Sequence, residues 1–259
     1  MPDWDAPQYL RFERERTQGC VDLARRVELE SPARIVDLGC GPGTSTAILK
    51  ARWPGARLTG IDSSPEMLAR ARTADPEIEW LAGDIGTWVP STPLDLVFSN
   101  AALHWLPRHS DLLRQLWAGV APRGALAFQV PAPGPQRSRW LDVLRGLLRE
   151  PAWQHLAPVD PAEDTVGTLS EYYDLLTGLG ARVDLWDTEY YHVLSNAGEI
   201  VEWVKGTALR PVLGQLPHAE ERTRFLEELT GRIRTVYVPQ QDGRVLFPFL
   251  RRFVIAYRP

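Results

Sequence analysis

The amino-acid sequence predicts a doubly wound α/β fold, in which a mostly parallel sheet of seven strands carries helical lid insertions. Up to Pro131, short apolar strands alternate with amphipathic helices, and this rhythm is typical of right-handed β–α–β units. A glycine-rich turn joins the first strand to a helix. After Pro131 the alternation stops, and helical patterns precede two long strands near the end.

In the segment before Pro131, the spacing of apolar residues and the residues that begin or end helices predict five strands and four helices. Apolar positions recur at helical spacing over residues 15–29, and Ser31-Pro32 ends that helix. Serine and proline at the start of the pattern 63–74 are good helix-start signals. We therefore expect strands at 33–41, 57–62, 77–84, 94–102 and 125–131, and further helices at 44–53, 63–74 and 110–124, the last beginning at Ser110.

The remainder of the chain predicts helices that interrupt the sheet and two strands that complete it. Helical patterns cover 140–150, 169–180, 196–209 and 218–236, and strands are expected at 182–194 and 247–259. We expect one domain over residues 1–259, with cap insertions at roughly 132–168 and 195–245. These insertions would fold over the carboxyl ends of the strands as a lid.

Composition excludes several classes of function. The 259 residues carry a net charge of −4, without a basic tail, so nucleic-acid binding through phosphate contacts is not expected. The two cysteines, Cys20 and Cys40, suit free thiols in a reducing compartment. No apolar run is long enough for a membrane span, and the histidines lack metal-ligand spacing. We expect a cytoplasmic protein, a monomer or weak homodimer, with no membrane partner and no metal.

The strongest chemical signal is the turn Asp37-Leu-Gly39-Cys-Gly41-Pro-Gly43. Glycine permits tight turns and a close approach of backbone to ligand. Ligands of such sheets bind outside the carboxyl ends of the strands, where the strand order reverses. Asp62-Ser63 follows the second strand, where a carboxylate can accept both ribose hydroxyls of a nucleoside. A nucleoside-containing cofactor is therefore expected at this edge.

Two cofactors fit a glycine turn followed by an acidic residue: a nicotinamide dinucleotide and S-adenosylmethionine. A pyrophosphate on the helix N-terminus would not favour a carboxylate such as Asp37 nearby, whereas the ammonium group of a methionine would. Asp84-Ile85 offers a carboxylate to an adenine amino group, and Ser99-Asn100 ends the strand expected beneath the sulfonium. We predict S-adenosylmethionine, with S-adenosylhomocysteine as product, bound by Asp37, Gly39, Gly41, Gly43, Asp62, Ser63, Asp84, Ile85, Ser99 and Asn100.

The motifs DLGCGPGTS, GIDSSPEML, GDI and SNAALHWL resemble those of class I methyltransferases, which have a Rossmann-like fold. Over nearly its whole length the chain is similar to the trans-aconitate 2-methyltransferase family, through WDAPQYLRFERERT, VDLWDTEYYH, ALRPVL and FPFLRRFVIA. It departs from the family pattern at APGPQRSR, residues 132–139. The resemblance implies methyl transfer from S-adenosylmethionine to a carboxylate of a small tricarboxylate, trans-aconitate, giving a methyl ester.

This reaction requires the two reactants to be positioned, but it does not require a general base. A carboxylate is already ionised at neutral pH, so we name no general base and expect in-line positioning with exclusion of water. Arginine suits a tricarboxylate because its planar fork binds carboxylates in a bidentate manner. The candidates for positioning the acceptor are His104, Trp105, Arg11, Arg16, Arg210, Tyr190 and Tyr191, with Arg251 or Arg252 as further cations.

Three other functions stay open at this point. The chain could methylate a different small acceptor, such as another carboxylic acid or a secondary metabolite. It could also be an NAD(P) oxidoreductase, against which Asp37 and Asp84 argue, or a non-catalytic S-adenosylmethionine-binding protein, because a fold by itself proves no activity.

Overall fold

The computed structural model describes residues 13–132, 138–156, 165–206 and 208–259. It contains a seven-stranded sheet in the order β3-β2-β1-β4-β5-β7-β6. The first five strands run parallel, and β7 pairs antiparallel with both β5 and β6. The predicted fold class is confirmed. The strands are β1 (Arg34–Leu38), β2 (Arg57–Asp62), β3 (Glu79–Ala82), β4 (Leu94–Asn100), β5 (Val120–Pro131), β6 (Arg182–Leu194) and β7 (Val245–Tyr257).

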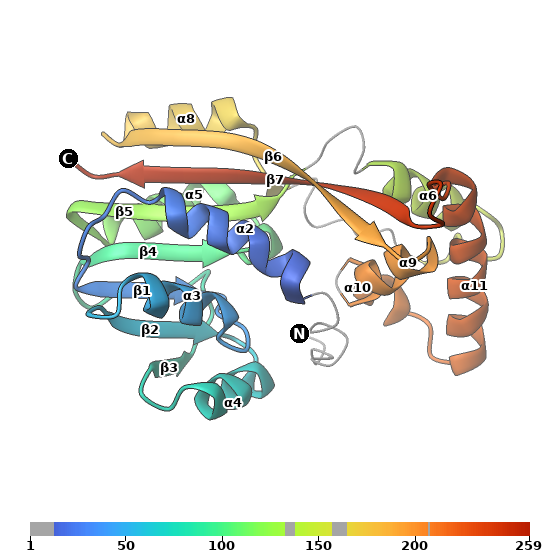
Figure 1. Ribbon diagram of the computed structural model, residues 1–259, viewed down its shortest axis with the longest axis horizontal. Coiled ribbons are helices and arrows are strands. Elements are labelled where there is room, and N and C mark those ends of the chain that lie inside the picture. The colour runs from blue at the N-terminus through green and yellow to red at the C-terminus, as the bar shows by residue number, and fades with distance from the viewer. Residues whose placement is uncertain (1–12, 133–137, 157–164, 207) are drawn as a thin grey trace.

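Helices cover both faces of the sheet because successive strand residues point to opposite sides. Ile35 packs in one apolar cluster with α2, α3 and α4, whereas its neighbour Val36 packs in another with α5 and α8. Figure 1 shows α2 lying across one face of the sheet. The bounds of these helices are α2 (Glu13–Arg26), α3 (Thr44–Arg52), α4 (Pro65–Ala74), α5 (His109–Ala118) and α8 (Leu169–Gly178).

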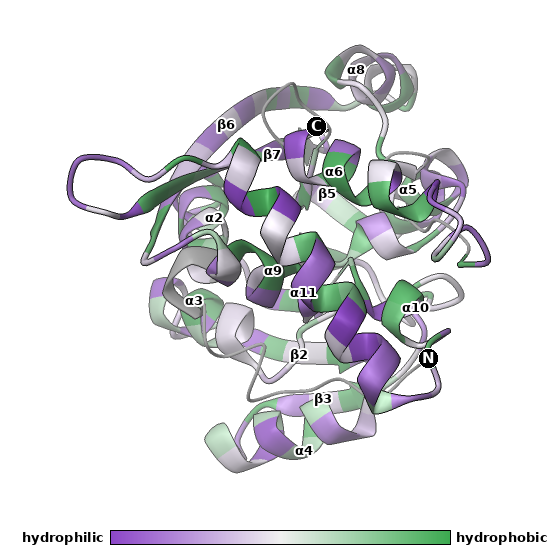
Figure 2. Ribbon diagram, turned by 90° about the vertical axis from the view of Figure 1, so that its right-hand side faces the viewer, coloured by the Kyte–Doolittle hydropathy of each residue, from purple (hydrophilic) through white to green (hydrophobic). Residues whose placement is uncertain are grey.

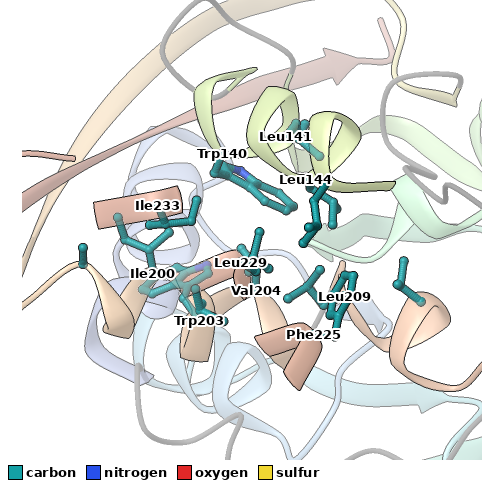
Figure 3. Packing of buried hydrophobic residues seen from close by; sticks show 14 of the residues in the cluster. Trp140, Leu141, Leu144, Ile200, Trp203, Val204, Leu209, Phe225, Leu229 and Ile233 are labelled. Atoms are coloured by element: carbon teal, nitrogen blue, oxygen red, sulfur yellow. The ribbon is translucent and has the colours of Figure 1, made fainter. Parts of the chain in front are cut away.

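Within the part of the chain that the structure describes, four more helices build a separate apolar core beyond the carboxyl ends of the parallel strands (Figure 1). They are α6 (Ser138–Leu148), α9 (Gly198–Lys205), α10 (Arg210–Leu213) and α11 (Ala219–Val236). Figure 3 shows Trp140 of α6, Val204 of α9 and Leu229 of α11 grouped in this interior. Seen from this end in Figure 2, α11 is the nearest helix and shows many hydrophilic residues. The helices expected as a lid thus lie where a ligand is expected, while the boundaries of the cap insertions remain a prediction.

The helix expected over 110–124 is shorter than the sequence indicated. It begins at His109, after Arg108 in the left-handed region at φ 55°, and it ends at Ala118. Val120 already belongs to β5, where it pairs with Leu94. The expected helix end was wrong because an apolar pair such as Val120-Ala121 fits a buried strand as well as a helix.

The sheet requires glycine at position 60, where β2 passes the indole ring of Trp80. A Cβ added to Gly60 would lie 2.3 and 2.4 Å from two atoms of that ring. The ring is buried, and its Nε1 donates to the Asp75 carbonyl at 2.8 Å. The ring therefore has little freedom to move away.

We expect Gly60→Ala to lower the free energy of unfolding by about 2 kcal/mol, because overpacking a core costs that order of energy. Urea denaturation measures the change. Gly55→Ala is the matched control, since a Cβ there would meet nothing within 4 Å. Equal effects of the two substitutions would show that the clash with Trp80 is relieved without cost.

None of the helices within the described ranges is long and apolar enough to cross a membrane. The same part of the chain contains no group of three or more His, Cys, Asp or Glu residues placed to hold a metal ion.

Candidate active site

A cleft of about 420 Å³, including space open to solvent, lies at the carboxyl ends of β1 and β4. It is formed by α2, the glycine turn after β1, the first residues of α3 and the end of β4. This is the edge at which doubly wound sheets bind ligands. The cleft is lined by Thr17, Cys20, Gly39, Cys40, Gly41, Pro42, Thr44, Ser45, Ile48 and Asn100.

The three glycines of the turn all have positive φ angles, of 73° at Gly39, 55° at Gly41 and 92° at Gly43. A Cβ at Gly39 would lie 2.2 Å from the Cβ of Ala102, so this glycine lets the turn pass the segment after β4. At Gly41 a Cβ would meet nothing within 4 Å. The backbone of Gly41 therefore borders open space that a ligand can fill.

Asp37 lies beneath this turn and is completely buried. Its Oδ2 accepts hydrogen bonds from Ser45 Oγ and Thr46 Oγ1, both at 2.6 Å, while its Oδ1 has no hydrogen-bond partner among the described residues. Burial raises the pKa of Asp37 to about 6, because desolvation outweighs the two hydroxyl donors, and the negative charge of Asp62 adds to the shift. The site thus holds a carboxyl group that a nearby cation would help to ionise.

Asp62 joins the glycine turn to the end of β2. Its Oδ2 accepts from the Gly41 N–H at 2.9 Å, and its Oδ1 accepts from the Ser64 N–H at 2.8 Å. An ionised carboxylate has about four acceptor positions, so these two bonds leave room for two more donors. The neighbouring Ser63 is exposed.

The other residues predicted for the cofactor differ in what they can offer. Asp84 is exposed after β3, and its Oδ1 accepts from the Gly86 N–H at 2.8 Å. The buried Ile85 lies beside the turn, with its Cδ1 3.4 Å from where a Cβ at Gly39 would be. Ser99 is buried and donates to the Leu38 carbonyl at 2.8 Å. Its hydroxyl therefore ties β4 to β1, whereas Asn100 faces the cleft.

His104 and Trp105 form a short 3-10 helix, η1 (Leu103–Trp105), after β4. His104 is buried, Trp105 is half-buried, and their ring centroids are 4.7 Å apart. The Thr165 hydroxyl donates to the His104 carbonyl at 2.9 Å, and His109 Nε2 lies 2.8 Å from the Leu103 carbonyl. This turn is thus held from both sides.

Of the residues predicted to position the acceptor, those that the structure describes are not among the residues that line the cleft. The Tyr190 hydroxyl donates to Asp22 Oδ2 at 2.6 Å, and Tyr191 is 54% exposed. Arg210 is half-buried at the start of α10. Arg11 lies outside the described residues, and Arg16 lies in α2 with its side chain outside the described part. The acceptor roles of these residues remain predictions.

Arg251 and Arg252 are adjacent residues of β7, so strand alternation points them to opposite sides of the sheet. Arg252 forms a bidentate pair with Asp187, at 3.0 and 2.8 Å, and its Nη1 donates to the Gly167 carbonyl at 2.6 Å. Arg251 points to the other side of the sheet, is buried, and donates to Gln129 Oε1 at 3.1 Å. Arg252 is thus committed to a structural pair, and Arg251 contacts Gln129, the register partner of the cleft residue Asn100.

Sequence reasoning named Arg16 of α2 as an acceptor candidate but missed Thr17 and Cys20, with which this helix lines the cleft. Their spacing of three residues places them on one helix face, but nothing in the sequence indicates that this face covers the cleft. Gln129 was also missed. Gln129 could have been found from the sequence, because it is the single polar side chain in the apolar segment ALAFQVP.

Comparison with known proteins decides which family this site belongs to. Residues 35–124 match a family model described as a methyltransferase domain. The chain is 44% identical to the trans-aconitate 2-methyltransferase of Azoarcus sp. strain BH72, with all of both chains covered. It is 46% identical to the enzyme of that name from Methylobacterium nodulans, with 100% of this chain and 99% of the relative covered. The chain belongs to the trans-aconitate 2-methyltransferase family.

Members of this family are S-adenosylmethionine-dependent methyltransferases, and solved structures share the fold. The YcgJ protein from Bacillus subtilis aligns with a TM-score of 0.60 at 14% identity, covering 93% of this chain and 98% of that protein. Phosphoethanolamine N-methyltransferase 2 from Haemonchus contortus, solved with S-adenosylhomocysteine, aligns at 0.58 and 12% identity, covering 93% of this chain and 52% of its own. The dinucleotide alternative is therefore set aside.

The residues present fit S-adenosylmethionine. The open space beside Gly41 suits a ligand pressed against backbone, and Asp62 retains acceptor positions for hydroxyl groups. The buried Asp37 carboxyl, with one oxygen that accepts no hydrogen bond within the described ranges, suits a site that receives a cation.

Proposed function

We propose that this protein transfers a methyl group from S-adenosylmethionine to a carboxylate oxygen of a small tricarboxylate, with trans-aconitate as the preferred acceptor. The observation that carries the proposal is the extent of the similarity. Identity of 44% runs over the whole of this chain and the whole of a relative named for that acceptor. It therefore includes the lid helices and not only the widespread methyltransferase core.

The bound cofactor would supply an activated methyl group on a positively charged sulfur. An oxygen of the acceptor carboxylate would form the new bond to the methyl carbon, and the electron pair of the broken carbon–sulfur bond would leave with the sulfur. No proton moves, because the carboxylate is ionised at neutral pH. The protein's part is to hold the two reactants in line and to keep water out.

We assign the cofactor to the edge formed by β1, β2, β3 and β4. Asp62 would accept the ribose hydroxyls, with Ser63 beside it, and Asp84 would accept from the adenine amino group, with Ile85 in apolar contact. The ammonium group would lie near Asp37, against the backbone of Gly39, Gly41 and Gly43. Ser99 would shape the floor through its bond to Leu38, and Asn100 would border the sulfonium.

The acceptor would lie between this edge and the lid. His104 and Trp105 follow β4 in a turn that two hydrogen bonds hold in place, which suits a residue pair that must orient a ligand. Arg210 stands at the start of a lid helix and, with Arg11 and Arg16, would neutralise the remaining carboxylates. We expect the enzyme to act in the cytoplasm as a monomer or weak homodimer.

The direct test is methyl transfer from labelled S-adenosylmethionine to a panel of trans-aconitate, cis-aconitate, citrate, isocitrate and several long-chain acids. Label on trans-aconitate above all other acids supports the proposal. Binding of the cofactor without transfer to any tricarboxylate would overturn the acceptor and direct attention to the divergent segment 132–139, of which residues 133–137 lie outside the described ranges.

Arg210→Ala is expected to raise the KM for the acceptor by about 10-fold or more, because a charge-assisted hydrogen bond contributes about 1.5–3 kcal/mol. The dissociation constant for the cofactor should stay within about twofold of the parent value, a change too small for a lost charge-assisted bond. Steady-state kinetics at saturating cofactor and calorimetry measure the two quantities.

Arg244→Ala is a suitable control for the loss of a positive charge, since the Arg244 side chain is 63% exposed and pairs with Asp242. Equal weakening of acceptor and cofactor binding in Arg210→Ala would contradict a specific carboxylate role.

A further inference from the structure

Three polar side chains form a chain of hydrogen bonds across β4, β5 and β7, and its last member faces the cleft. Arg251 Nη1 donates to Gln129 Oε1 at 3.1 Å, and Gln129 Nε2 donates to Asn100 Oδ1 at 2.5 Å. Asn100 and Gln129 are register partners on neighbouring parallel strands. Gln129 is fully buried, and Arg251 is 3% exposed.

The chemistry of arginine fixes the orientation of the two amide groups in this series of hydrogen bonds. A guanidinium group only donates hydrogen bonds, so the Gln129 amide must turn its oxygen toward Arg251. The NH₂ group of Gln129 then faces Asn100, which must accept the hydrogen bond through its own amide oxygen. The NH₂ group of Asn100 is therefore the part of that amide that remains for the cleft, which Asn100 lines.

Helix α2 covers these hydrogen-bonded residues at Gly19, a position without a side chain. A Cβ at Gly19 would lie 2.9 Å from Arg251 Cδ and 3.6 Å from Gln129 Cδ, so the helix backbone lies directly against both residues. Cys20, the next residue of α2, lines the cleft. Arg251 and Gln129 are thus shielded from water, whereas Asn100 is half-buried at the cleft. In buried surroundings hydrogen bonds hold their orientation more strongly.

We propose that Asn100 donates from its amide nitrogen to a carboxylate oxygen in the cleft, and that Arg251 is a positioning residue that acts through Gln129. The inference rests on the proposed function for its ligand. A donor suits a carboxylate because one oxygen can accept this bond while the other attacks the methyl carbon. The amino-acid end of the cofactor also carries a carboxylate, and the experiment separates the two sources.

Gln129→Glu is the informative substitution because it keeps the shape of the side chain and reverses its chemistry. A glutamate accepts from Arg251 and from Asn100, so the Asn100 amide turns over and presents its oxygen to the cleft. Binding of one carboxylate ligand should weaken about 10-fold or more, since a charge-assisted bond is replaced by repulsion. Arg251→Gln removes the group that fixes the orientation of the Gln129 amide. Binding of the same ligand should therefore weaken by a smaller factor, about threefold.

Two calorimetric titrations are made on each variant: S-adenosylhomocysteine into the protein, and trans-aconitate into the protein saturated with S-adenosylhomocysteine. The variants are Gln129→Glu, Arg251→Gln, Asn100→Ala and the double variant Asn100→Ala with Gln129→Glu. Arg26→Gln serves as control, because Arg26 pairs with Asp184 at the surface. Thermal unfolding verifies that each variant is folded, and the second titration needs no turnover.

The expected result is that one of the two affinities falls in all three single variants and that the double variant is no weaker than Asn100→Ala alone. Such non-additivity shows that Gln129 acts through Asn100. The affinity that falls identifies the carboxylate. Additive losses, or losses below twofold in folded variants, would overturn the inference. Failure of the parent protein to bind trans-aconitate would instead count against the proposed function, and the cofactor titration would then decide the inference alone.

Discussion

Replacing Asp62 by alanine is expected to raise the dissociation constant for S-adenosylmethionine by about 100-fold or more. This magnitude follows from the loss of two charge-assisted hydrogen bonds to ribose hydroxyls, each contributing about 1.5–3 kcal/mol, with tenfold in affinity for every 1.4 kcal/mol. The substitution also removes the acceptor of the Gly41 N–H, so the glycine turn loses one of its hydrogen bonds to β2, while the N–H groups of Gly39 and Cys40 still donate to the Ile61 carbonyl. Isothermal titration calorimetry at constant pH measures the effect.

Glu79→Gln is the matched control for loss of a carboxylate. Glu79 lies on the neighbouring strand β3 and pairs with Arg57, and its side chain is 44% exposed. This variant should bind the cofactor as the parent does. Unchanged cofactor affinity in a folded Asp62→Ala variant would show that the ribose does not lie at the end of β2.

Local patterns in the sequence were sufficient to predict most of the sheet and the edge at which the cleft lies. β6 has the bounds 182–194 that its apolar pattern predicted, and Ser64 accepts from the Met67 N–H at the start of α4, as a serine before a proline suggests. The glycine turn and Asp62 also meet as expected, because the carboxyl ends of neighbouring parallel strands lie at one edge.

What the sequence did not reveal depends on contacts between distant segments. β7 lies between β5 and β6, an order that arises from pairing of strands far apart in the chain. The position of α2 over Arg251, made possible by Gly19, likewise follows from tertiary packing and not from the helical pattern itself. For the same reason Tyr190, expected near the acceptor, has its hydroxyl bonded to Asp22 of α2.

The Asp37 carboxyl is expected to make stability and cofactor binding depend on pH in opposite directions. Its pKa is about 6 in the folded protein and about 3.9 when unfolded. The folded state thus holds this proton more tightly, and the stabilising contribution is complete below about pH 4 and lost as the pH rises through 6. Near pH 7 the loss amounts to about 3 kcal/mol, because the folded and unfolded pKa values differ by about 2 and each tenfold change in proton affinity corresponds to about 1.4 kcal/mol.

Asp37→Asn isolates this contribution, because the amide does not titrate and any constant cost of burying it cancels. The unfolding free energy of the parent minus that of the variant should fall by about 3 kcal/mol between pH 3 and pH 7, measured by urea denaturation without ligand. Over the same range the affinity of the parent for S-adenosylmethionine should rise relative to the variant, because the ionised carboxylate attracts the ammonium group. A pH-independent difference in stability would mean that Asp37 ionises as readily in the fold as in water. If the ratio of the two affinities for S-adenosylmethionine did not change with pH, the ammonium group of the cofactor would not lie near Asp37. Opposite slopes would show that the fold keeps a destabilising buried charge at neutral pH because the cofactor uses it.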